Sequence, residues 1–384
     1  MRVHQATGVA GPYDAVSEQA AAYRRLLEDW GMAGGVHASL VAPGAPAGIE
    51  LLDRLDAAPD DLVLIHYAGY VPGMAPLLDL PQRKLLLYHN VTPARYFWRV
   101  EPRVALTCEL GRAHLPSWIA AARATAAVSS YNARELRSLG AADPRVVPIL
   151  FDPERVRAPR GRPQEPDGDG RGVHAGGGKA QRGGGAGAEP EGAPLVLSVG
   201  RLAPHKRPDL VIRAFALLQR HLEPDARLLC VGPPVNPDYE RRLEQLVVEV
   251  GARQVRLAGG LAQPELNAAL AEASVFLSLS EHEGFCVPLL EALAAEVPTV
   301  ARPSGGMPEV GADAVLWSED SDPAVIADVT EDPDLAVVAE LVQLAIRDAE
   351  LRAELVRRGR RRVAHFSPQR VASELRSAVE LALA

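Results

Sequence analysis

The fold is decided by the stretch LVLSVGRLAPHK, residues 195–206, in which a short apolar run leads directly into a loop with two cations. A short apolar run that ends at a glycine is typical of a buried strand in a parallel sheet. Arg201 and Lys206 would then leave the carboxyl end of that strand, which is where open α/β sheets bind ligands. Two cations at such a place suit a diphosphate, and the simpler alternative is that both are solvated loop charges.

Apolar runs of this kind alternate with helical periodicity along the rest of the chain, which is the pattern of parallel sheets covered by helices. One helix is indicated by Val16, Ala20, Tyr23, Leu27 and Trp30, which recur at spacings of three and four residues. Strands are predicted at 61–66, 84–88, 126–128, 146–149, 195–199, 228–231, 255–257, 275–279 and 299–301. We therefore expect two similar α/β domains.

A glycine-rich stretch divides the two sets of predicted strands. Residues 161–192 hold 12 of the 33 glycines and almost no apolar side chains, so burial cannot offset the entropy of ordering them. A tail that binds nucleic acid is the alternative, but the stretch contains no aromatic residue and few cations. We predict a flexible connector.

Charge and cysteine content exclude several classes of protein. Lys and Arg number 41 against 49 Asp and Glu, so the net charge of −8 provides no general basic field for nucleic acid. Cys108, Cys230 and Cys286 lie far apart without C-x-x-C spacing, which favours a reducing, cytoplasmic setting. We expect no signal peptide, and no apolar run approaches the ~18 residues of a membrane span. A peripheral contact at the inner membrane face stays open.

A second candidate site is the stretch SEHEGFCVPLLE, residues 280–291, which again follows a predicted strand. Pro288 marks a helix start, so the preceding backbone N–H groups would point outward and favour an anion. Glu283 and Glu291 are far enough apart to contact different parts of one ligand, unless they only favour the positive end of the helix dipole. The nearby cations favour phosphate handling over acid/base hydrolysis by a carboxylate pair. Gly305 and Gly306, after the next strand, fit a tight turn or a ligand contact about equally.

Together, these motifs resemble a known donor site. Gly200-Arg201-Leu202 with Lys206, followed by Glu283-Gly284-Phe285 and Glu291 in an E-x7-E arrangement, is similar to the donor site of the retaining GT-B glycosyltransferases of family four, the glycosyl transferases group 1. This family includes bacterial mannosyl- and glucosyltransferases. Residues 11–15, 87–93 and 129–132 are similar to a branch found in bacterial surface-polysaccharide assembly.

The resemblance implies a GT-B fold, in which two Rossmann-like, doubly wound domains face each other across a cleft and a C-terminal helix crosses back to the first domain. Ser367 and Pro368 begin a predicted terminal helix that suits this crossing. We expect residues 1–152 with 367–384 to form the acceptor-side domain, 153–193 the Gly-rich linker, and 194–366 the domain that binds the nucleotide sugar.

The resemblance also implies roles for single residues. Arg201 and Lys206 would hold the donor diphosphate and stabilise the charge on it as it leaves. Glu283 would accept hydrogen bonds from the donor sugar, Glu291 would accept them from the ribose, and His89 would contact the sugar across the cleft. The implied catalytic set is His89, Arg201, Lys206 and Glu283, and the implied donor-binding set is Gly284, Phe285, Cys286, Val287, Glu291 and Gly11.

Some positions depart from the common family pattern or leave two interpretations open. Arg207 and Cys286 stand where glycine is frequent in relatives. Without the resemblance, His89 would be interpreted as an ordinary core or loop histidine. Residues 96–98, an aromatic run, would line an acceptor groove or belong to a buried helix face.

The expected function is a retaining hexosyltransferase that uses a nucleoside-diphosphate sugar, with GDP-mannose favoured and a UDP-sugar next, and a saccharide or glycoconjugate hydroxyl as acceptor. We expect no cofactor and no metal, because two cations and a helix end supply the charge that a divalent ion would supply. The acidic triplet at 320–322 is interpreted as a solvated turn. The alternatives are a sugar-nucleotide epimerase of the same architecture, for which no acid/base set is found beyond His89, and a non-catalytic nucleotide-sugar-binding protein.

Overall fold

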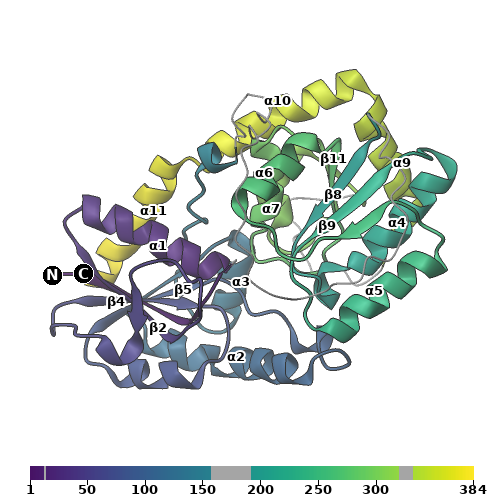
Figure 1. Ribbon diagram of the computed structural model, residues 1–384. Coiled ribbons are helices and arrows are strands. Elements are labelled where there is room, and N and C mark those ends of the chain that lie inside the picture. The colour runs from purple at the N-terminus through teal and green to yellow at the C-terminus, as the bar shows by residue number, and fades with distance from the viewer. Residues whose placement is uncertain (13, 157–191, 320–331) are drawn as a thin grey trace, which may run out of the picture.

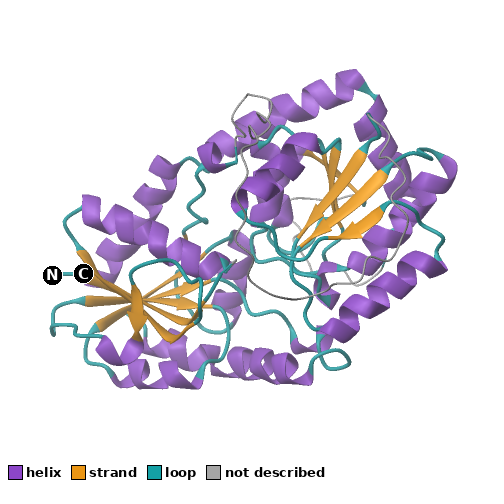
Figure 2. Cartoon of the chain, in the orientation of Figure 1, coloured by secondary structure: helices purple, strands orange, loops and turns teal. Residues whose placement is uncertain are grey.

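The computed structural model describes residues 1–12, 14–156, 192–319 and 332–384. Two sheets, each with helices packed against it, form the two lobes of the molecule (Figure 1). The strands lie inside each lobe and the helices lie outside them (Figure 2). The expected two-domain α/β architecture is therefore confirmed.

The first sheet has seven strands in the order β3-β2-β1-β4-β5-β6-β7, and every neighbouring pair is parallel. Its strands are β1 (Val3–Ala10), β2 (Ala33–Val41), β3 (Ile49–Leu51), β4 (Leu62–Tyr67), β5 (Arg83–Tyr88), β6 (Ala124–Ala127) and β7 (Arg145–Val146). Its α-helices are α1 (Ala15–Asp29), α2 (Pro102–Ala121) and α3 (Ser130–Ser138). The strand order reverses direction between β1 and β4, which makes this the switch point of the sheet.

The second sheet has six parallel strands in the order β10-β9-β8-β11-β12-β13. Its strands are β8 (Leu195–Val199), β9 (Arg227–Val231), β10 (Val255–Leu257), β11 (Val275–Ser278), β12 (Thr299–Ala301) and β13 (Val315–Trp317). Its α-helices are α4 (Pro208–His221), α5 (Pro237–Glu249), α6 (Gln263–Glu272), α7 (Val287–Ala294), α8 (Met307–Gly311), α9 (Leu335–Arg347) and α10 (Ala349–His365). The switch point of this sheet lies between β8 and β11.

All nine strands predicted from apolar runs are present, with bounds that differ by at most a few residues. The sequence interpretation missed β1, β2, β3 and β13. In β1, His4, Gln5 and Thr7 are buried although they are polar, so this strand shows no apolar run. Pairing with β2 on one side and β4 on the other, rather than an apolar composition, keeps β1 in the sheet.

The predicted terminal helix, α11 (Pro368–Leu383), packs against β5, β6 and β7 of the first sheet. The Ser367 side chain accepts a hydrogen bond from the backbone N–H of Arg370 and so caps the helix start. In Figure 1 the yellow α11 and the purple α1 lie on the same lobe, and the Arg376 guanidinium of α11 lies over the Trp30 ring at the end of α1. The expected crossing back to the first domain is confirmed. The predicted linker bounds stay a prediction, because 157–191 lie outside the described residues, as does the acidic triplet at 320–322.

Candidate functional site

The loops that carry both predicted motifs follow β8 and β11, the two strands at the switch point of the second sheet. Parallel strands end on one edge, so both loops leave the sheet side by side. Arg201 is exposed and lines a narrow cavity with Lys206, Ser198 and Ser280. The two predicted cations therefore share one cavity at the place where an open α/β sheet binds a ligand.

Lys206 and Glu283, one from each motif, form an ion pair with 2.5 Å between Nζ and Oε1. Both side chains are largely buried. Burial by itself lowers the pKa of Lys206, but the neighbouring Glu283 carboxylate outweighs burial and holds that pKa above its usual value. Lys206 is therefore a fixed positive charge at neutral pH. The pair joins two loops that are 77 residues apart in the chain.

The side chains of the two residues directly before α7 are buried. Cys286 is the N-cap residue, and its φ of 76° is in the left-handed region. Its thiol is buried, which raises its pKa well above the usual value. Phe285 is also buried and meets Phe366 edge-on, with ring centroids 5.3 Å apart. The side chains of Phe285 and Cys286 are therefore packed in the core and are not free to contact a ligand.

Glu291 lies one turn inside α7, as the sequence predicted. Burial raises its pKa to about 6. Within the described part of the chain, its carboxylate has no hydrogen-bond partner. A half-buried carboxylate in this state is suited to accept hydrogen bonds from ligand hydroxyls.

Gly305 and Gly306 support the Glu283 loop from behind. Gly305 has a φ of +56°, and a Cβ on it would lie 2.1 Å from the carbonyl oxygen of Glu283. The backbone N–H of Gly306 donates to the same oxygen at 2.8 Å. Of the two interpretations left open for this glycine pair, the tight turn accounts for its geometry, because it holds the Glu283 backbone in place.

The first domain meets this loop directly. Ser129 Oγ donates to the carbonyl oxygen of Gly284 at 2.7 Å, and a Cβ on Gly284 would lie 2.7 Å from the carbonyl oxygen of His89. His89 follows β5, and burial lowers its pKa to about 3, so its ring is neutral. The structure thus brings His89 of the first half next to the loop that carries Glu283, the partner of Lys206.

A family model described as glycosyl transferases group 1 matches residues 185–362, the region that contains both loops. Residues 185–362 are therefore similar to that family. The predicted resemblance is thereby confirmed for the half that carries the motifs.

Two curated relatives illustrate the match of this group 1 domain. D-inositol 3-phosphate glycosyltransferase of Corynebacterium efficiens is 34% identical over 141 residues, which are 35% of this chain and 33% of that protein. The GDP-mannose-dependent alpha-(1-6)-phosphatidylinositol monomannoside mannosyltransferase of Mycolicibacterium smegmatis is 36% identical over 124 residues, which are 30% of this chain and 31% of that protein. The aligned part thus spans about a third of the length of these relatives.

Solved structures extend the likeness to the whole fold. The crystal structure of Anabaena Alr3699/HepE in complex with UDP and glucose superposes with a TM-score of 0.69 at 14% identity, covering 99% of this chain and 100% of that chain. WaaG, a glycosyltransferase involved in lipopolysaccharide biosynthesis, gives a TM-score of 0.63 at 16% identity, covering 96% of this chain and 98% of that chain. The predicted GT-B fold is confirmed.

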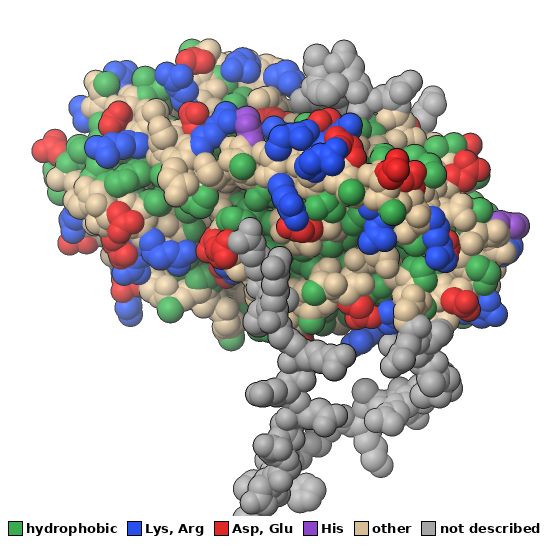
Figure 3. Space-filling model, turned by 90° about the horizontal axis from the view of Figure 1, so that it is seen from above, with side chains coloured by type: hydrophobic (Ala, Val, Ile, Leu, Met, Phe, Trp, Pro, Cys, Tyr) green, Lys and Arg blue, Asp and Glu red, His purple; other side chains and the backbone are tan. Residues whose placement is uncertain are grey.

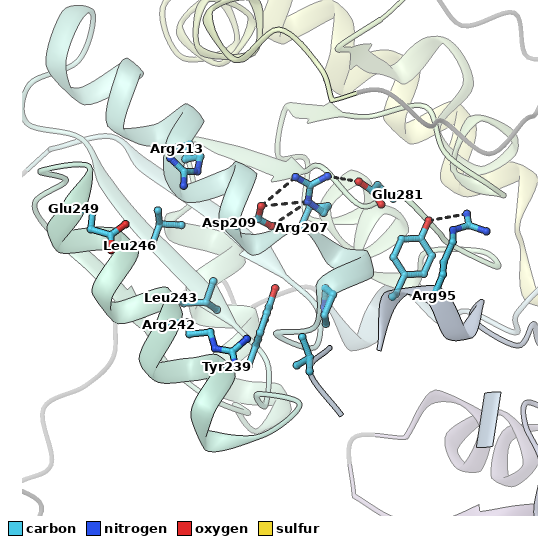
Figure 4. A pocket seen from close by; sticks show the side chains of 13 residues that line it. Arg95, Arg207, Asp209, Arg213, Tyr239, Arg242, Leu243, Leu246, Glu249 and Glu281 are labelled. Atoms are coloured by element: carbon cyan, nitrogen blue, oxygen red, sulfur yellow. Dashed lines mark hydrogen bonds and ion pairs between the residues drawn. The ribbon is translucent and has the colours of Figure 1, made fainter. Parts of the chain in front are cut away.

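The two departures from the family pattern both fall at left-handed backbone. Arg207, directly before α4, has a φ of 49°, and Cys286, directly before α7, has a φ of 76°. Glycine adopts this region at no steric cost, which explains its frequency there. The Arg207 guanidinium is held by Asp209 and Glu281 at the edge of a pocket next to the group 1 motifs (Figure 4). Arg207 therefore lines this pocket, whereas the adjacent Lys206 lines the cavity that also holds Arg201.

The aromatic run at 96–98 divides among three environments. Phe97 is buried and meets His205 with ring centroids 5.4 Å apart, so it packs the first domain against the Lys206 loop of the group 1 domain. Tyr96 lines the pocket of Figure 4, and Trp98 is exposed. Of the three, only Phe97 is buried, and it follows a short 3-10 helix (Ala94–Tyr96) rather than lying on a helix face.

Among the described residues, no contact is found between Gly11 and the other residues predicted for the site. It lies at the end of β1, and a Cβ on it would meet the Cβ of Ala42 at 3.7 Å, an ordinary contact. Nothing in its own geometry therefore requires glycine. Its predicted role toward phosphate or acceptor stays a prediction.

Several residues that build the site were missed in the sequence. Ser130, at the first position of α3, donates its backbone N–H to the Glu309 carboxylate at 2.6 Å, which ties the first domain to α8. His282 Nε2 lies 2.6 Å from Asn90 Oδ1 and makes a second bridge between the domains. The only signal in the sequence was a serine directly before a predicted helix. Such a signal cannot predict a partner 179 residues away.

The surface over α10 shows side chains of both charges rather than a field of one sign (Figure 3). Arginines of this helix pair with acids: Arg358 with Glu354, and Arg360 with Glu296. Among the described residues, no helix is both long and apolar enough to cross a membrane. The predicted peripheral membrane contact stays a prediction.

Proposed function

We propose that the protein is a retaining glycosyltransferase that moves a hexose from a nucleoside-diphosphate sugar to a hydroxyl of a saccharide or glycoconjugate. The observation that carries the proposal is the Lys206–Glu283 ion pair at the switch point, with Arg201 in the same cavity as Lys206 and the His89 main chain against the Gly284 loop. A cation next to a carboxylate suits a ligand whose diphosphate adjoins a sugar with free hydroxyls. GDP-mannose is the first candidate donor and a UDP-sugar the second. Relatives named for GDP-mannose and a neighbour solved with UDP support both.

The proposed transfer needs no nucleophile from the protein. The bond between the anomeric carbon and the diphosphate oxygen breaks, and Arg201 and Lys206 stabilise the negative charge that develops on the leaving group. The acceptor hydroxyl attacks from the same face, its oxygen bonds to the anomeric carbon, and its proton passes to the departing phosphate oxygen. The two side-chain cations supply the charge for leaving-group stabilisation, so we propose metal-independent transfer. Closure of the two domains around the donor would keep water from the reacting carbon.

The pKa of His89 separates this function from epimerisation. An epimerase must remove and return a proton at the sugar, and an effective acid or base has a pKa near the working pH. A histidine whose pKa is about 3 is a poor base and carries no proton to give at neutral pH. Glycosyl transfer needs only hydrogen bonds and charge from the protein, so a neutral His89 is compatible with transfer and not with epimerisation.

We also propose a cytoplasmic location, with contact at the inner membrane face left to experiment.

Calorimetric binding of GDP, UDP and ADP to the whole protein, with and without chelator, tests the proposal. We expect one nucleotide to bind tightly, without a metal requirement, and Arg201→Ala to weaken it strongly because a diphosphate contact is lost. The matching sugar nucleotide should then support transfer, with retention visible in the product by NMR. Absence of binding by every nucleotide, or binding that needs a metal and ignores Arg201, would overturn it.

Glu291 gives the nucleotide affinity a predictable pH dependence. With a pKa of about 6, its carboxylate is ionised at neutral pH and accepts from both ribose hydroxyls, whereas protonation in more acidic solution makes one oxygen a donor. We expect the dissociation constant of the nucleotide to rise roughly tenfold as the pH falls from about 7 to about 5.

The matched variant for this measurement is Glu291→Gln, which should bind more weakly at neutral pH and show less pH dependence. Because the terminal phosphate of the ligand also titrates with a pKa of about 6, the quantity to compare is the difference between the two proteins at each pH. Parallel pH curves for both proteins would show that Glu291 does not contact the ribose.

A further inference from the structure

Two buried polar side chains behind His89 have no part in the function proposed so far. Gln5 lies in β1 and His66 in β4, the neighbouring strands at the switch point of the first sheet. His66 Nδ1 lies 3.0 Å from His89 Nε2, and His66 Nε2 lies 2.9 Å from Gln5 Oε1. Gln5 Nε2 in turn donates to the carbonyl oxygen of Ala20 at 3.0 Å. The contacts form one chain from α1 to His89.

The direction of every hydrogen bond in this chain follows from its far end. The Ala20 carbonyl oxygen only accepts, so the amide nitrogen of Gln5 faces it and the amide oxygen faces His66. His66 must therefore carry its proton on Nε2. Burial and the neighbouring His89 lower the pKa of His66 well below its usual value, so the ring is neutral and its Nδ1 is an acceptor.

The same logic then fixes His89. Its Nε2 faces an acceptor and must carry the proton, and since the ring is neutral its Nδ1 holds a lone pair. Within the described residues, Nδ1 of His89 has no hydrogen-bond partner and is not among the buried unsatisfied atoms. His89 therefore offers an acceptor, and not a donor, at its free nitrogen.

We propose that Gln5 and His66 are positioning residues that hold His89 in the tautomer with a free Nδ1, so that His89 accepts a hydrogen bond from one hydroxyl of the donor sugar. The assignment rests on the glycosyltransferase function proposed above. A sugar hydroxyl can donate to this nitrogen, whereas an ether oxygen or a phosphate oxygen cannot. The site thus selects donors that carry a hydroxyl at the facing carbon.

Burying a polar group costs free energy unless the group has a hydrogen-bond partner. This cost fixes which atom donates and which accepts at each hydrogen bond between Ala20 and His89. A reversed His89 tautomer would place two lone pairs against each other, at the His66 contact or, if His66 also reverses, at the Gln5 oxygen. Neither arrangement can be relieved by water, because Gln5 and His66 are almost fully buried. The tautomer is therefore set before the donor binds.

Nitrogen NMR of the protein labelled with ¹⁵N-histidine tests the tautomer without any activity assay. Protonated and unprotonated ring nitrogens differ widely in chemical shift, and the His89 signals are assigned by their loss in His89→Asn. We expect the shift of an unprotonated nitrogen at His89 Nδ1 and of a protonated one at Nε2, both in the wild-type protein. The opposite assignment would overturn the proposal even if the protein transfers sugar.

Gln5→Glu tests the link to the donor. A carboxylate cannot donate to Ala20 and would favour a doubly protonated His66, whose Nδ1–H would force the proton of His89 onto Nδ1. His89 would then present a donor. We expect kcat/KM to fall about tenfold or more, because the hydrogen bond from the sugar hydroxyl to His89 is lost and an N–H group stands in its place. In the same variant, the chemical shift of the protonated nitrogen should be found at His89 Nδ1 and that of the unprotonated nitrogen at His89 Nε2.

Gln19→Glu is the matched control, because Gln19 is a buried glutamine of α1 whose Oε1 accepts from the backbone N–H of Leu150 and which does not contact His66. It should leave both the His89 shifts and kcat/KM near their wild-type values. A series of donors in which single sugar hydroxyls are replaced by hydrogen completes the test. One deoxy donor should lose rate with the wild type and lose little more with Gln5→Glu, since both changes remove the same bond.

The outcomes separate the two proposals. Equal losses for every deoxy donor in both proteins would overturn the role of Gln5 and His66 while leaving transfer intact. If no sugar nucleotide is turned over, the proposed function fails, and the NMR result still decides the tautomer. Wild-type shifts in Gln5→Glu would show that Gln5 does not control His89.

Discussion

Lys206→Met should lower kcat/KM for sugar transfer by roughly a hundredfold to a thousandfold, the range seen when one pre-positioned charge or donor is removed from a transition state. The Lys206 ammonium lies beside Glu283 in a largely buried cavity, where charge interactions are weakly screened. Charge on the leaving diphosphate grows as the glycosidic bond breaks, so the loss should fall on kcat more than on nucleotide binding. Steady-state kinetics with a matched donor measures both.

Lys84→Met provides the control for removing a buried lysine. Lys84 is buried at the start of β5, far from the carboxyl ends of the strands, and its Nζ donates to the carbonyl oxygen of Leu80 at 2.5 Å. This variant should reduce stability and leave kcat/KM of the folded protein unchanged. A loss of activity in Lys206→Met that is matched by Lys84→Met would mean that folding, and not transition-state charge, explains the result. A loss confined to nucleotide affinity would limit Lys206 to ground-state binding.

The place of Lys206 could be predicted from sequence, whereas its partner could not. An apolar run followed by Gly200 and two cations indicates a strand and a ligand loop, because local periodicity and local charge are both visible in the chain. The contact with Glu283 depends on β8 and β11 being neighbours in the sheet. Strand order is a property of the whole fold, so the sequence placed both groups near one ligand without showing that they pair.

In the first sheet, by contrast, one inner strand could not be predicted from the sequence at all. β1 is an inner strand of the sheet, between β2 and β4, yet His4, Gln5 and Thr7 break its apolar pattern. Such residues are tolerated because partners from other elements satisfy them, as His66 does for Gln5. A periodicity argument counts these positions against a strand. Gln5 is one of the residues that break the apolar pattern of β1, and it is also one of the two residues proposed to orient His89. A local pattern therefore fails to predict this strand because a buried polar residue in it is proposed to serve the site.

Left-handed backbone explains a further part of what sequence alone could not settle. Arg207 and Cys286 stood out only as departures from a family pattern, with no reason given by the residues themselves. Their φ angles of 49° and 76° show that the backbone requirement is the same as for glycine. The side chains then use the position differently: Arg207 reaches surface acids, whereas the Cys286 thiol is buried.

Leu375→Ala should lower the free energy of unfolding by roughly 2–5 kcal/mol, because a fully buried leucine leaves a cavity that the surroundings fill only in part. Leu375 is 1% exposed and belongs to the face of α11 that packs on β5, β6 and β7. This helix is the last element of the chain and covers the first sheet, so its docking completes a core begun at the other terminus. Urea denaturation followed by circular dichroism and tryptophan fluorescence measures the change.

Leu381→Ala is the matched control on the same helix, since Leu381 is 40% exposed. It should change the free energy of unfolding by less than about 0.5 kcal/mol. Equal losses for both variants would mean that helix propensity, rather than docking, sets the stability of α11. Nucleotide affinity of folded Leu375→Ala should equal that of the wild type, because Arg201, Lys206 and Glu291 stand on the other sheet. A parallel loss of nucleotide binding would instead show that the docked helix holds the donor domain in its binding form, and so couples the two halves of the fold.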